Sequence, residues 1–292
     1  MTSPTLAETI RVLDGFYPPQ TAAEWDRVGL VTGDPAQRID RIHFAVDPAL
    51  AVIEEARDIG ADLLVTHHPL LLRGVHSVAT STAKGAAITT LVVADLALYC
   101  AHTNADVATP GVNDALAAAC GLSADADALA ALDEEGGRAI GRVGDLPQPT
   151  TLGVFSRALA DALPAAPAGL RVSGDPDATV RRVAVMGGAG DDRFDAVRRS
   201  GADVYVTADL RHHPALEARE EARGGAPYLI DAGHWATESL WLAASAERLR
   251  AALAAQGYDV QTTVSQLRTD PWDFVVPTGH RDPTKPKEHG RP

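Results

Sequence analysis

The segment Arg41–His68, RIHFAVDPALAVIEEARDIGADLLVTHH, decides the fold because the chain repeats its pattern at Arg182–Asp209, RVAVMGGAGDDRFDAVRRSGADVYVTAD. Each segment contains a β-rich run, a turn, a stretch with helical spacing of apolar residues, and a second apolar run after Gly-Ala-Asp. This order predicts a strand–helix–strand unit, in which the two strands are normally parallel and the connection is right-handed. The sequence therefore predicts two related α/β halves.

Two later segments, LALYCAHT at Leu96–Thr103 and YLIDAGH at Tyr228–His234, are also apolar runs that end near a histidine. The expected fold class is α/β, with two related lobes from an internal duplication and mixed sheets flanked by helices. We place the first lobe at 1–125, the second at 126–268 and a C-terminal extension at 269–292.

The connection between the lobes, Ser123–Pro149, is rich in Asp, Ala and Gly and ends in GRVGDLPQP, which predicts a surface connection rather than a strand or long helix. Helical patterns occur in five other segments: Pro4–Phe16, Asn113–Cys120, Ser156–Leu163, Ala215–Ala222 and Thr237–Gln256. From about Gly279 the chain is charged, proline-rich and nearly devoid of apolar residues, which predicts disorder. We therefore give no role to its histidines, His280 and His289.

The composition excludes several classes of protein. The 39 acidic and 26 basic residues give a formal net charge of −13, which disfavours binding to nucleic acid or anionic lipid. Cys100 and Cys120 lack CxxC spacing, so neither a disulfide framework nor a thiolate zinc site is expected. The sequence shows no signal peptide and no apolar run of the ~20 residues that a membrane span requires. We expect a cytoplasmic protein with no membrane or nucleic-acid partner.

The clearest functional feature is ADLLVTHHP at Ala61–Pro69, an apolar strand that ends on His67 and His68. Two polar rings at the end of a buried strand need partners, and a metal site supplies them. Neighbouring side chains on a regular strand point to opposite faces. The two rings therefore serve one site only if the backbone turns there; otherwise each binds a different ion, which predicts a two-metal centre.

Polar side chains that can take part in catalysis or metal binding also follow the other predicted strands: His102, Asp106, Asp209, His212, His213, His234 and Glu238. A mixture of imidazoles and carboxylates suits Zn²⁺, Mn²⁺ or Fe²⁺, whereas Ca²⁺ prefers oxygen alone and structural zinc prefers thiolates. His234 and Glu238 are four residues apart, so one helix face presents both to one ion or to a pair. His102 has two interpretations, as a metal ligand or as a residue that orients Asp106.

Other polar or aromatic residues have simpler interpretations. His43 lies inside a predicted strand and is expected to be a hydrogen-bonded structural residue. Trp25 and Asp26 are most simply a packed aromatic and a turn or cap residue, and the alternative is a loop that lines the site. The run GGAGDDRF at Gly187–Phe194 lacks the third glycine of a dinucleotide-binding loop, so we expect a tight turn with an N-capping acid, with phosphate binding as the alternative.

The motifs WDRVGL, ADLLVTHHP, AHTNADVATPGVNDALA, GRVGDLP, ADVYVTADLRHHPALEA and DAGHWATE, in this order, resemble the Nif-three-like family. Members of that family are often labelled GTP cyclohydrolase I type 2 homologues. The resemblance covers Met1 to about Arg268 and implies a Nif-three-like fold, assembly into a toroidal homohexamer and a dinuclear metal centre in each subunit.

Residue by residue, the resemblance implies that five side chains are metal ligands: His67, His68, Asp106, His234 and Glu238. It also implies that His102 lies near the centre and that Asp209 and His213 line the cleft. The chain departs from the family pattern at Arg27, where asparagine is usual, and in TAD at Thr207–Asp209, where TGD is common.

The function expected is a metal-dependent hydrolase that acts on a nucleotide or phosphorylated small molecule. Two divalent ions per subunit, of zinc, iron or manganese, would activate water, and His102 or His213 would carry the proton. The alternative is a non-enzymatic protein for metal storage, delivery or regulatory interaction.

Overall fold

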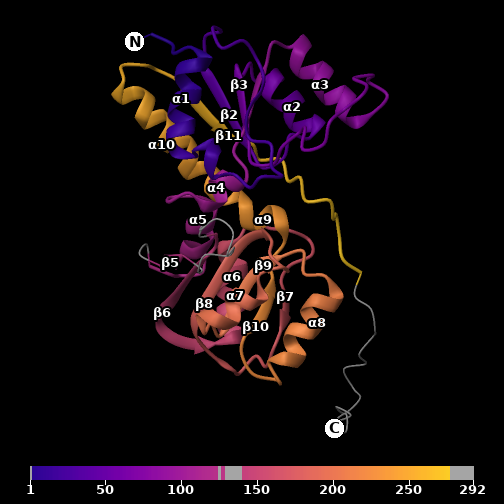
Figure 1. Cartoon of the computed structure of the whole chain (residues 1–292), viewed down its shortest axis with the longest axis vertical. Coiled ribbons are helices and arrows are strands. Elements are labelled where there is room, and N and C mark those ends of the chain that lie inside the picture. The colour runs from indigo at the N-terminus through magenta and orange to yellow at the C-terminus, as the bar shows by residue number, and fades with distance from the viewer. Residues whose placement is uncertain (1, 124–125, 129–139, 277–292) are drawn as a thin grey trace.

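The computed structural model describes residues 2–123, 126–128 and 140–276. They form two lobes, each built on a mixed β-sheet with helices on both faces (Figure 1). The predicted α/β class with two lobes is therefore confirmed.

The first lobe contains a five-stranded sheet. Its strands lie in the order β1 (Gly29–Thr32), β4 (Ala97–Cys100), β3 (Leu63–Thr66), β2 (Arg41–Ala45) and β11 (Gln261–Val264). Helices α1 (Leu6–Phe16) and α10 (Trp241–Ala255) cover one face, and α2 (Leu50–Asp58) and α3 (Ala83–Val93) cover the other. Only β1 is antiparallel to its neighbour in this sheet.

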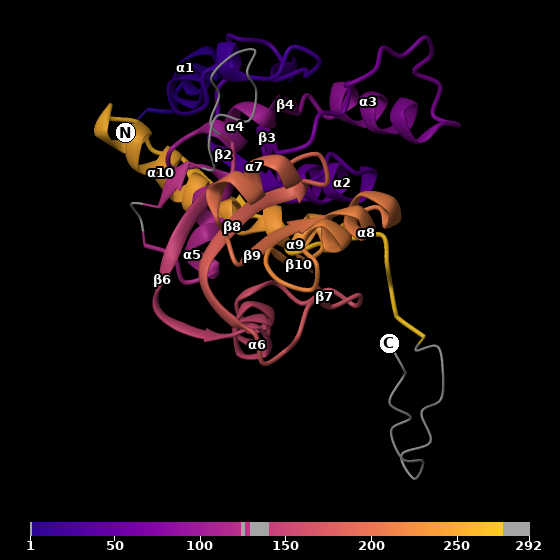
Figure 2. The same ribbon diagram turned by 60° about the horizontal axis from the view of Figure 1, so that its bottom comes forward.

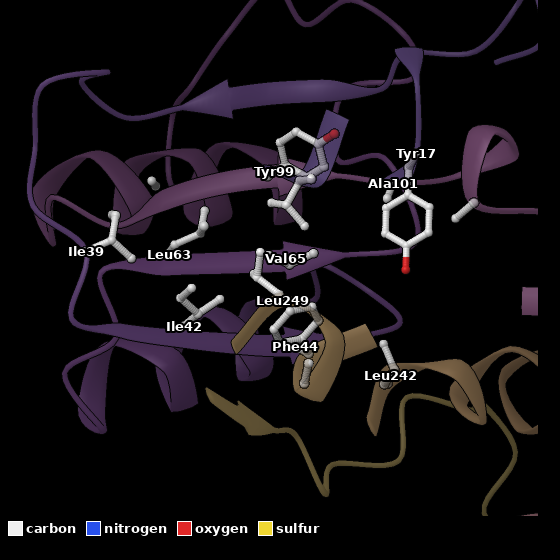
Figure 3. Packing of buried hydrophobic residues seen from close by; sticks show 14 of the residues in the cluster. Tyr17, Ile39, Ile42, Phe44, Leu63, Val65, Tyr99, Ala101, Leu242 and Leu249 are labelled. Atoms are coloured by element: carbon white, nitrogen blue, oxygen red, sulfur yellow. The ribbon is translucent and has the colours of Figure 1, made fainter. Parts of the chain in front are cut away.

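The core of the first lobe joins the sheet to α10, which comes almost 200 residues later in the chain. Figure 3 shows Leu249 of α10 beside Phe44 of β2 and Val65 of β3, and all three side chains are fully buried. Burial of a side chain of this size contributes ~1.5–3 kcal/mol. The C-terminal helix is therefore part of the first lobe.

The second lobe contains a six-stranded sheet. Its strands lie in the order β5 (Asp127–Ala128), β6 (Arg142–Thr151), β8 (Thr179–Ala189), β9 (Val204–Ala208), β10 (Tyr228–Asp231) and β7 (Arg171–Ser173). Helices α5 (Val112–Ala119) and α6 (Leu152–Ala162) pack on one face, and α7 (Phe194–Ser200) and α8 (His212–Glu221) pack on the other.

The repeat seen in the sequence is present in space. In the first lobe β2, α2 and β3 form a unit with parallel strands, and β8, α7 and β9 form its counterpart. The order β4-β3-β2 in one sheet matches β10-β9-β8 in the other, and an antiparallel strand flanks β4 and β10 alike. The carboxyl ends of the equivalent strands supply the side chains discussed below.

The prediction for Ser123–Pro149 is wrong in its second part, because β6 is a long strand paired antiparallel with β8. Figure 2 shows the two strands side by side along the second lobe. Their register is irregular between Asp145 and Thr150, and the two prolines of GRVGDLPQP lie in that interval. An interrupted ladder tolerates proline, which has no N–H to donate.

The predicted range of the second lobe, 126–268, is also wrong in its last part. β11 pairs with β2 of the first sheet, and α10 packs on that sheet. The predicted helix Thr237–Gln256 is in fact two helices, α9 (His234–Ser239) and α10. In the C-terminal extension, residues 269–276 have no regular secondary structure; the predicted disorder from about Gly279, with His280 and His289, lies outside the described residues.

Short helices fill the junction between the lobes. α4 (Thr103–Val107) follows β4, and α9 follows β10, so each starts where a strand of its sheet ends. α4 also contacts the 3₁₀ turn η1 (Pro19–Thr21). Figure 1 shows α4, α5 and α9 between the two sheets. Residues on the two strand-following helices can therefore reach a common site.

Candidate metal centre

The five predicted ligands come together in the cleft between the lobes. His67 and His68 follow β3, Asp106 lies on α4, and His234 and Glu238 lie on α9. β3 ends at Thr66 and the backbone bends at the two histidines, so both rings face the cleft with centroids 5.1 Å apart. We expected either a backbone turn that brings both rings to one site or a regular strand in which each ring binds a different ion. The structure shows the backbone turn.

Glu238 lies at the centre of the cluster. Its Oε1 is 3.4 Å from Nε2 of His67 and 3.0 Å from Nε2 of His234, and its Oε2 is 3.0 Å from Nε2 of His68. Asp106 Oδ1 lies 3.7 Å from Nε2 of His67. Each oxygen of Glu238 thus faces a different side of the imidazole cluster.

Three of these atoms are buried without a hydrogen-bond partner in the described part of the chain: His67 Nε2, Asp106 Oδ1 and Glu238 Oε2. Unpaired buried polar atoms are costly, and their convergence at one point fits a site for a metal ion. The donor atoms form two groups within 4.8 Å, one of His67, His68 and His102 and one of His68, His234 and Glu238. These groups could hold a metal ion, and nitrogen with carboxylate oxygen suits zinc, iron or manganese.

The other ring nitrogen of each histidine has a fixed acceptor. Nδ1 of His67 lies 2.9 Å from the carbonyl oxygen of Ala101, and Nδ1 of His68 lies 2.7 Å from Asp47. Nδ1 of His234 lies 2.8 Å from Asp209. These oxygens accept hydrogen bonds, so Nδ1 donates and Nε2 is directed into the cleft, as in many metal sites.

The charged side chains of the cluster shift each other's pKa values. Burial alone would raise the pKa of Glu238, but the charges of His67 and His68 hold it well below its usual range. Burial alone would lower the pKa of His68, but the Glu238 charge and the hydrogen bond to Asp47 raise it to about 10. The pKa of His234 is raised to about 11, because its hydrogen bonds to Asp209 and Glu238 outweigh its burial. An ion would replace the protons on these imidazoles.

Asp106 and His67 are also buried. Burial raises the pKa of Asp106 above its usual range, although the charge of His67 opposes this. Burial would lower the pKa of His67, but the charges of Glu238 and Asp106 raise it. The charge of His67 is thus balanced by Asp106 and Glu238, whereas the two carboxylates repel each other, which also raises the pKa of Asp106.

His102 lies beside the cluster, with its ring centroid 5.1 Å from that of His67 and 5.5 Å from that of His68. Its Nδ1 lies 2.9 Å from Asp26, so the ring is oriented by Asp26 and does not use this nitrogen to orient Asp106. The interpretation of His102 as a metal ligand remains compatible with the structure, because it belongs to one of the two groups.

The interpretation of Trp25 as a packed aromatic is wrong. Its side chain is 59% exposed and lines a cavity beside the cluster. Asp26 is buried, and its carboxylate accepts hydrogen bonds from the backbone N–H and hydroxyl of Thr103 as well as from His102. Asp26 therefore does act on the start of α4, and it also positions a site residue.

The outcomes for the remaining histidines differ. His43 is buried and hydrogen-bonded to Thr263 and Glu55, as expected of a structural residue. Asp209 holds His234 at the cleft. His212 and His213 are exposed in the first turn of α8 with rings 5.1 Å apart, and His213 is not among the described residues that line the cavity. The structure does not bring His213 to the cluster.

The GGAGDDRF run has a role at the cluster that its sequence pattern does not indicate. β8 continues through Gly187 and Gly188, and Arg193, not an acid, caps α7, with no side-chain capping bond to a described residue. Gly188 has φ 68°, and a Cβ atom there would lie 2.2 Å from Oε1 of Glu238 and 3.1 Å from Nε2 of His234. Glycine at this position leaves the space in which the two ligand atoms meet.

A cavity of about 1000 Å³ opens beside the cluster and is lined by both lobes. His68, His102, Asp106, His234 and Glu238 contribute to its wall. The site thus combines potential metal ligands with space for a small molecule.

The fold and the cluster define a two-lobed α/β protein with a potential metal site in the cleft between its lobes. The sequence profile of the Duf34/NIF3 (NGG1p interacting factor 3) family matches residues 4–271, and the chain belongs to this family. Among the described residues, no helix is both long and apolar enough to cross a membrane.

Relatives confirm the assignment along most of the chain. A protein of Streptomyces coelicolor named GTP cyclohydrolase 1 type 2 homolog is 49% identical over 274 residues, which cover 94% of this chain and 95% of the relative. A Mycobacterium leprae protein of the same name is 34% identical over 377 aligned positions, covering 93% and 96%. The crystal structure of a Bacillus cereus protein related to NIF3 superposes with a TM-score of 0.86 at 26% identity, covering 94% and 100%.

Proposed function

We propose that this chain is a metal-dependent hydrolase that uses two divalent ions of zinc, iron or manganese per subunit. Its substrate is a nucleotide or phosphorylated small molecule. The observation that carries the proposal is the convergence of unpartnered buried nitrogen and oxygen atoms beside a cavity of about 1000 Å³. Storage of metal requires the ligands alone, whereas hydrolysis also requires room for a substrate.

The residues proposed to hold the ions are His67, His68, Asp106, His234 and Glu238. The two oxygens of Glu238 face different imidazoles, which favours it as the bridging carboxylate. When bound, such ions lower the pKa of a coordinated water and polarise the bond under attack. Asp47, Asp209 and the carbonyl of Ala101 keep the imidazoles in the orientation that ligation requires.

We assign proton transfer to His102 rather than to His213. Asp26 accepts the hydrogen bond of His102 Nδ1, which fixes the ring and leaves Nε2 to take up or release a proton. Thr103 holds Asp26 in turn, so the pair is rigid. His213 is exposed outside the cavity and cannot do this within one subunit.

The relatives named above are called GTP cyclohydrolase 1 type 2 homologs. The lining of the cavity bears on whether a triphosphate such as GTP would bind here. Arg193 is the one arginine or lysine among the described residues that line it. Its Nε lies 3.2 Å from Asp192, whose negative charge offsets that of the guanidinium. This lining favours a substrate with fewer anionic groups than a triphosphate.

The direct test is to purify the protein without chelator, measure its metal by elemental analysis and screen phosphoesters and nucleotides. We expect about two ions per chain and turnover that disappears with chelator and returns with metal. His68→Ala and Glu238→Gln should lose metal and turnover together. Metal content unchanged in both variants would reject the site, and stoichiometric metal without turnover of any compound would favour storage or delivery.

We also propose a cytoplasmic toroidal homohexamer. Four exposed apolar side chains lie close together in the C-terminal segment, Trp272, Phe274, Val275 and Val276, and exposed apolar groups of this kind favour association. Native mass spectrometry should give six times the chain mass, and a monomer at micromolar concentration would reject the hexamer.

A further inference from the structure

We propose that Trp25 is a stacking platform for a planar aromatic ring of the substrate. This inference deepens the proposed function, because it narrows the substrate to a compound whose reacting group is on, or next to, an aromatic ring. Trp25 is a large apolar side chain that is 59% exposed, and it faces the same cavity as the potential metal ligands.

Hydrogen bonds within the loop of Trp25 and to α4 fix the position of the exposed indole. The backbone N–H of Asp26 donates to the carbonyl of Ala23 at 2.9 Å, and the N–H of Ala23 donates to the hydroxyl of Thr103 at 2.9 Å. The buried carboxylate of Asp26 holds the loop to the start of α4. With Ala23 and Asp26 held on either side of it, the indole is presented to the cavity on a rigid backbone, which reduces the entropy lost when a ligand binds.

His102 connects Trp25 to the metal cluster. The Trp25 and His102 ring centroids are 5.9 Å apart with an interplanar angle of 77°, and His102 in turn contacts the rings of His67 and His68. A ligand ring stacked on the indole is therefore separated from the proposed ions by about the width of the His102 ring. This spacing places the ring itself, or a group attached to it, at the reacting centre.

The rest of the cavity lining is compatible with a ligand that has a flat apolar ring. Four apolar side chains also line the cavity: Leu72, Val107, Ile140 and Met186. A sugar phosphate without a ring would leave these side chains and the indole in water. An aromatic compound with one anionic group would cover them and place its anion towards the ions or Arg193.

The test is the binding of three aromatic phosphates, adenosine 5′-monophosphate, guanosine 5′-monophosphate and 4-nitrophenyl phosphate, with ribose 5-phosphate as the matched probe without an aromatic ring. Dissociation constants are measured by calorimetry on the full chain, both metal-loaded and chelated. We expect at least one aromatic probe to bind more tightly than ribose 5-phosphate. Trp25→Ala should weaken that probe at least about fivefold, since ring stacking on an aromatic side chain contributes ~1–3 kcal/mol, while Trp25→Phe should retain most of the affinity.

Val93→Ala is the control, because Val93 is 80% exposed on α3 and does not line this cavity. It should keep the wild-type preference for the aromatic probe. Equal affinity of wild type for aromatic and ring-free probes would overturn the inference, as would equal losses in Trp25→Ala and Val93→Ala. A changed native mass in Trp25→Ala with unchanged binding would instead assign the indole to a subunit contact. Metal content, measured in parallel, shows separately whether the proposed metal site has failed.

Discussion

Asp47 accepts a hydrogen bond from Nδ1 of His68 at 2.7 Å, and its other carboxylate oxygen accepts one from the hydroxyl of Thr269. Burial alone would raise the pKa of Asp47, but the hydrogen bond from His68 lowers it, so the carboxylate stays charged. A residue of the C-terminal segment thereby helps to orient a proposed metal ligand on the first lobe. Asp47 follows β2 and His68 follows β3, at the same edge of one sheet.

The first prediction is that Asp47→Ala weakens metal binding by about 10- to 100-fold, because His68 loses the acceptor that fixes its ring. Competition with a chromophoric chelator measures the affinity. Asp58→Ala is the matched control, since Asp58 is exposed and pairs with Arg57 far from the cleft. Equal affinities in Asp47→Ala and Asp58→Ala would contradict the role given to Asp47.

The second prediction concerns Gly188. A methyl group there would meet Oε1 of Glu238 at 2.2 Å, so Gly188→Ala should displace Glu238 and reduce the metal content. Gly169→Ala provides the control, because Gly169 has φ 58° and nothing within 4 Å of its Cβ position. The control carries only the cost of a left-handed conformation, ~1–2 kcal/mol. If both variants bind metal like the wild type, Gly188 does not shape the site.

The third prediction tests the packing of α5 against β6. The buried guanidinium of Arg142 donates to both oxygens of Asp114, at 2.6 and 2.9 Å, and to the carbonyl oxygens of Ala108 and Gly141. Arg142→Met should lower the free energy of unfolding by about 3 kcal/mol, because Asp114 and these carbonyls lose their donor.

Urea denaturation measures this loss, and Arg250→Met is its control. Arg250 pairs with Glu247 on the surface of α10, where such a pair contributes below about 1 kcal/mol. An effect of Arg142→Met as small as that of the control would show that the buried pair is dispensable.

The fourth prediction is a pH dependence at the first helix. Hydrogen bonds from the backbone of Thr5, the hydroxyl of Tyr258 and the side chain of Thr5 lower the pKa of Glu8 from 4.5 to about 2. The folded state thus favours charged Glu8, and this stabilisation is complete above pH 4.5 and is lost as the pH falls to about 2. Glu8→Gln should therefore be less stable than wild type at pH 6, with a difference that shrinks below pH 4.5. Urea midpoints that stay parallel down to pH 2 would refute it.

The sequence predicted the features that depend on local pattern. Three features could be recognised from the sequence, because strands and the residues that follow them have short-range patterns: the Gly-Ala-Asp runs, the strand–helix–strand units and the histidines at strand ends. His67, His68 and Glu238 meet in the cleft as expected, since equivalent strand ends of a duplicated fold converge.

The features that depend on distant contacts could not be predicted. Nothing local shows that α10 returns to the first lobe, because the hydrophobic pattern of a helix does not say which sheet it covers. The same holds for Trp25, whose exposure depends on hydrogen bonds between Asp26 and a helix some 75 residues later. The role of Asp47 could have been predicted, because Asp47 follows a predicted strand in AVDP just as His67 and His68 follow theirs.

The most direct test of the account is anomalous X-ray diffraction from crystals of the metal-loaded protein, with data collected at the absorption edge of the metal found by elemental analysis. The account predicts two peaks in the cleft, about 3.5–4 Å apart as in other two-metal sites, within bonding distance of the Nε2 atoms of His67, His68 and His234 and bridged by Glu238. Strong peaks elsewhere on the molecule, with none in the cleft, would contradict it.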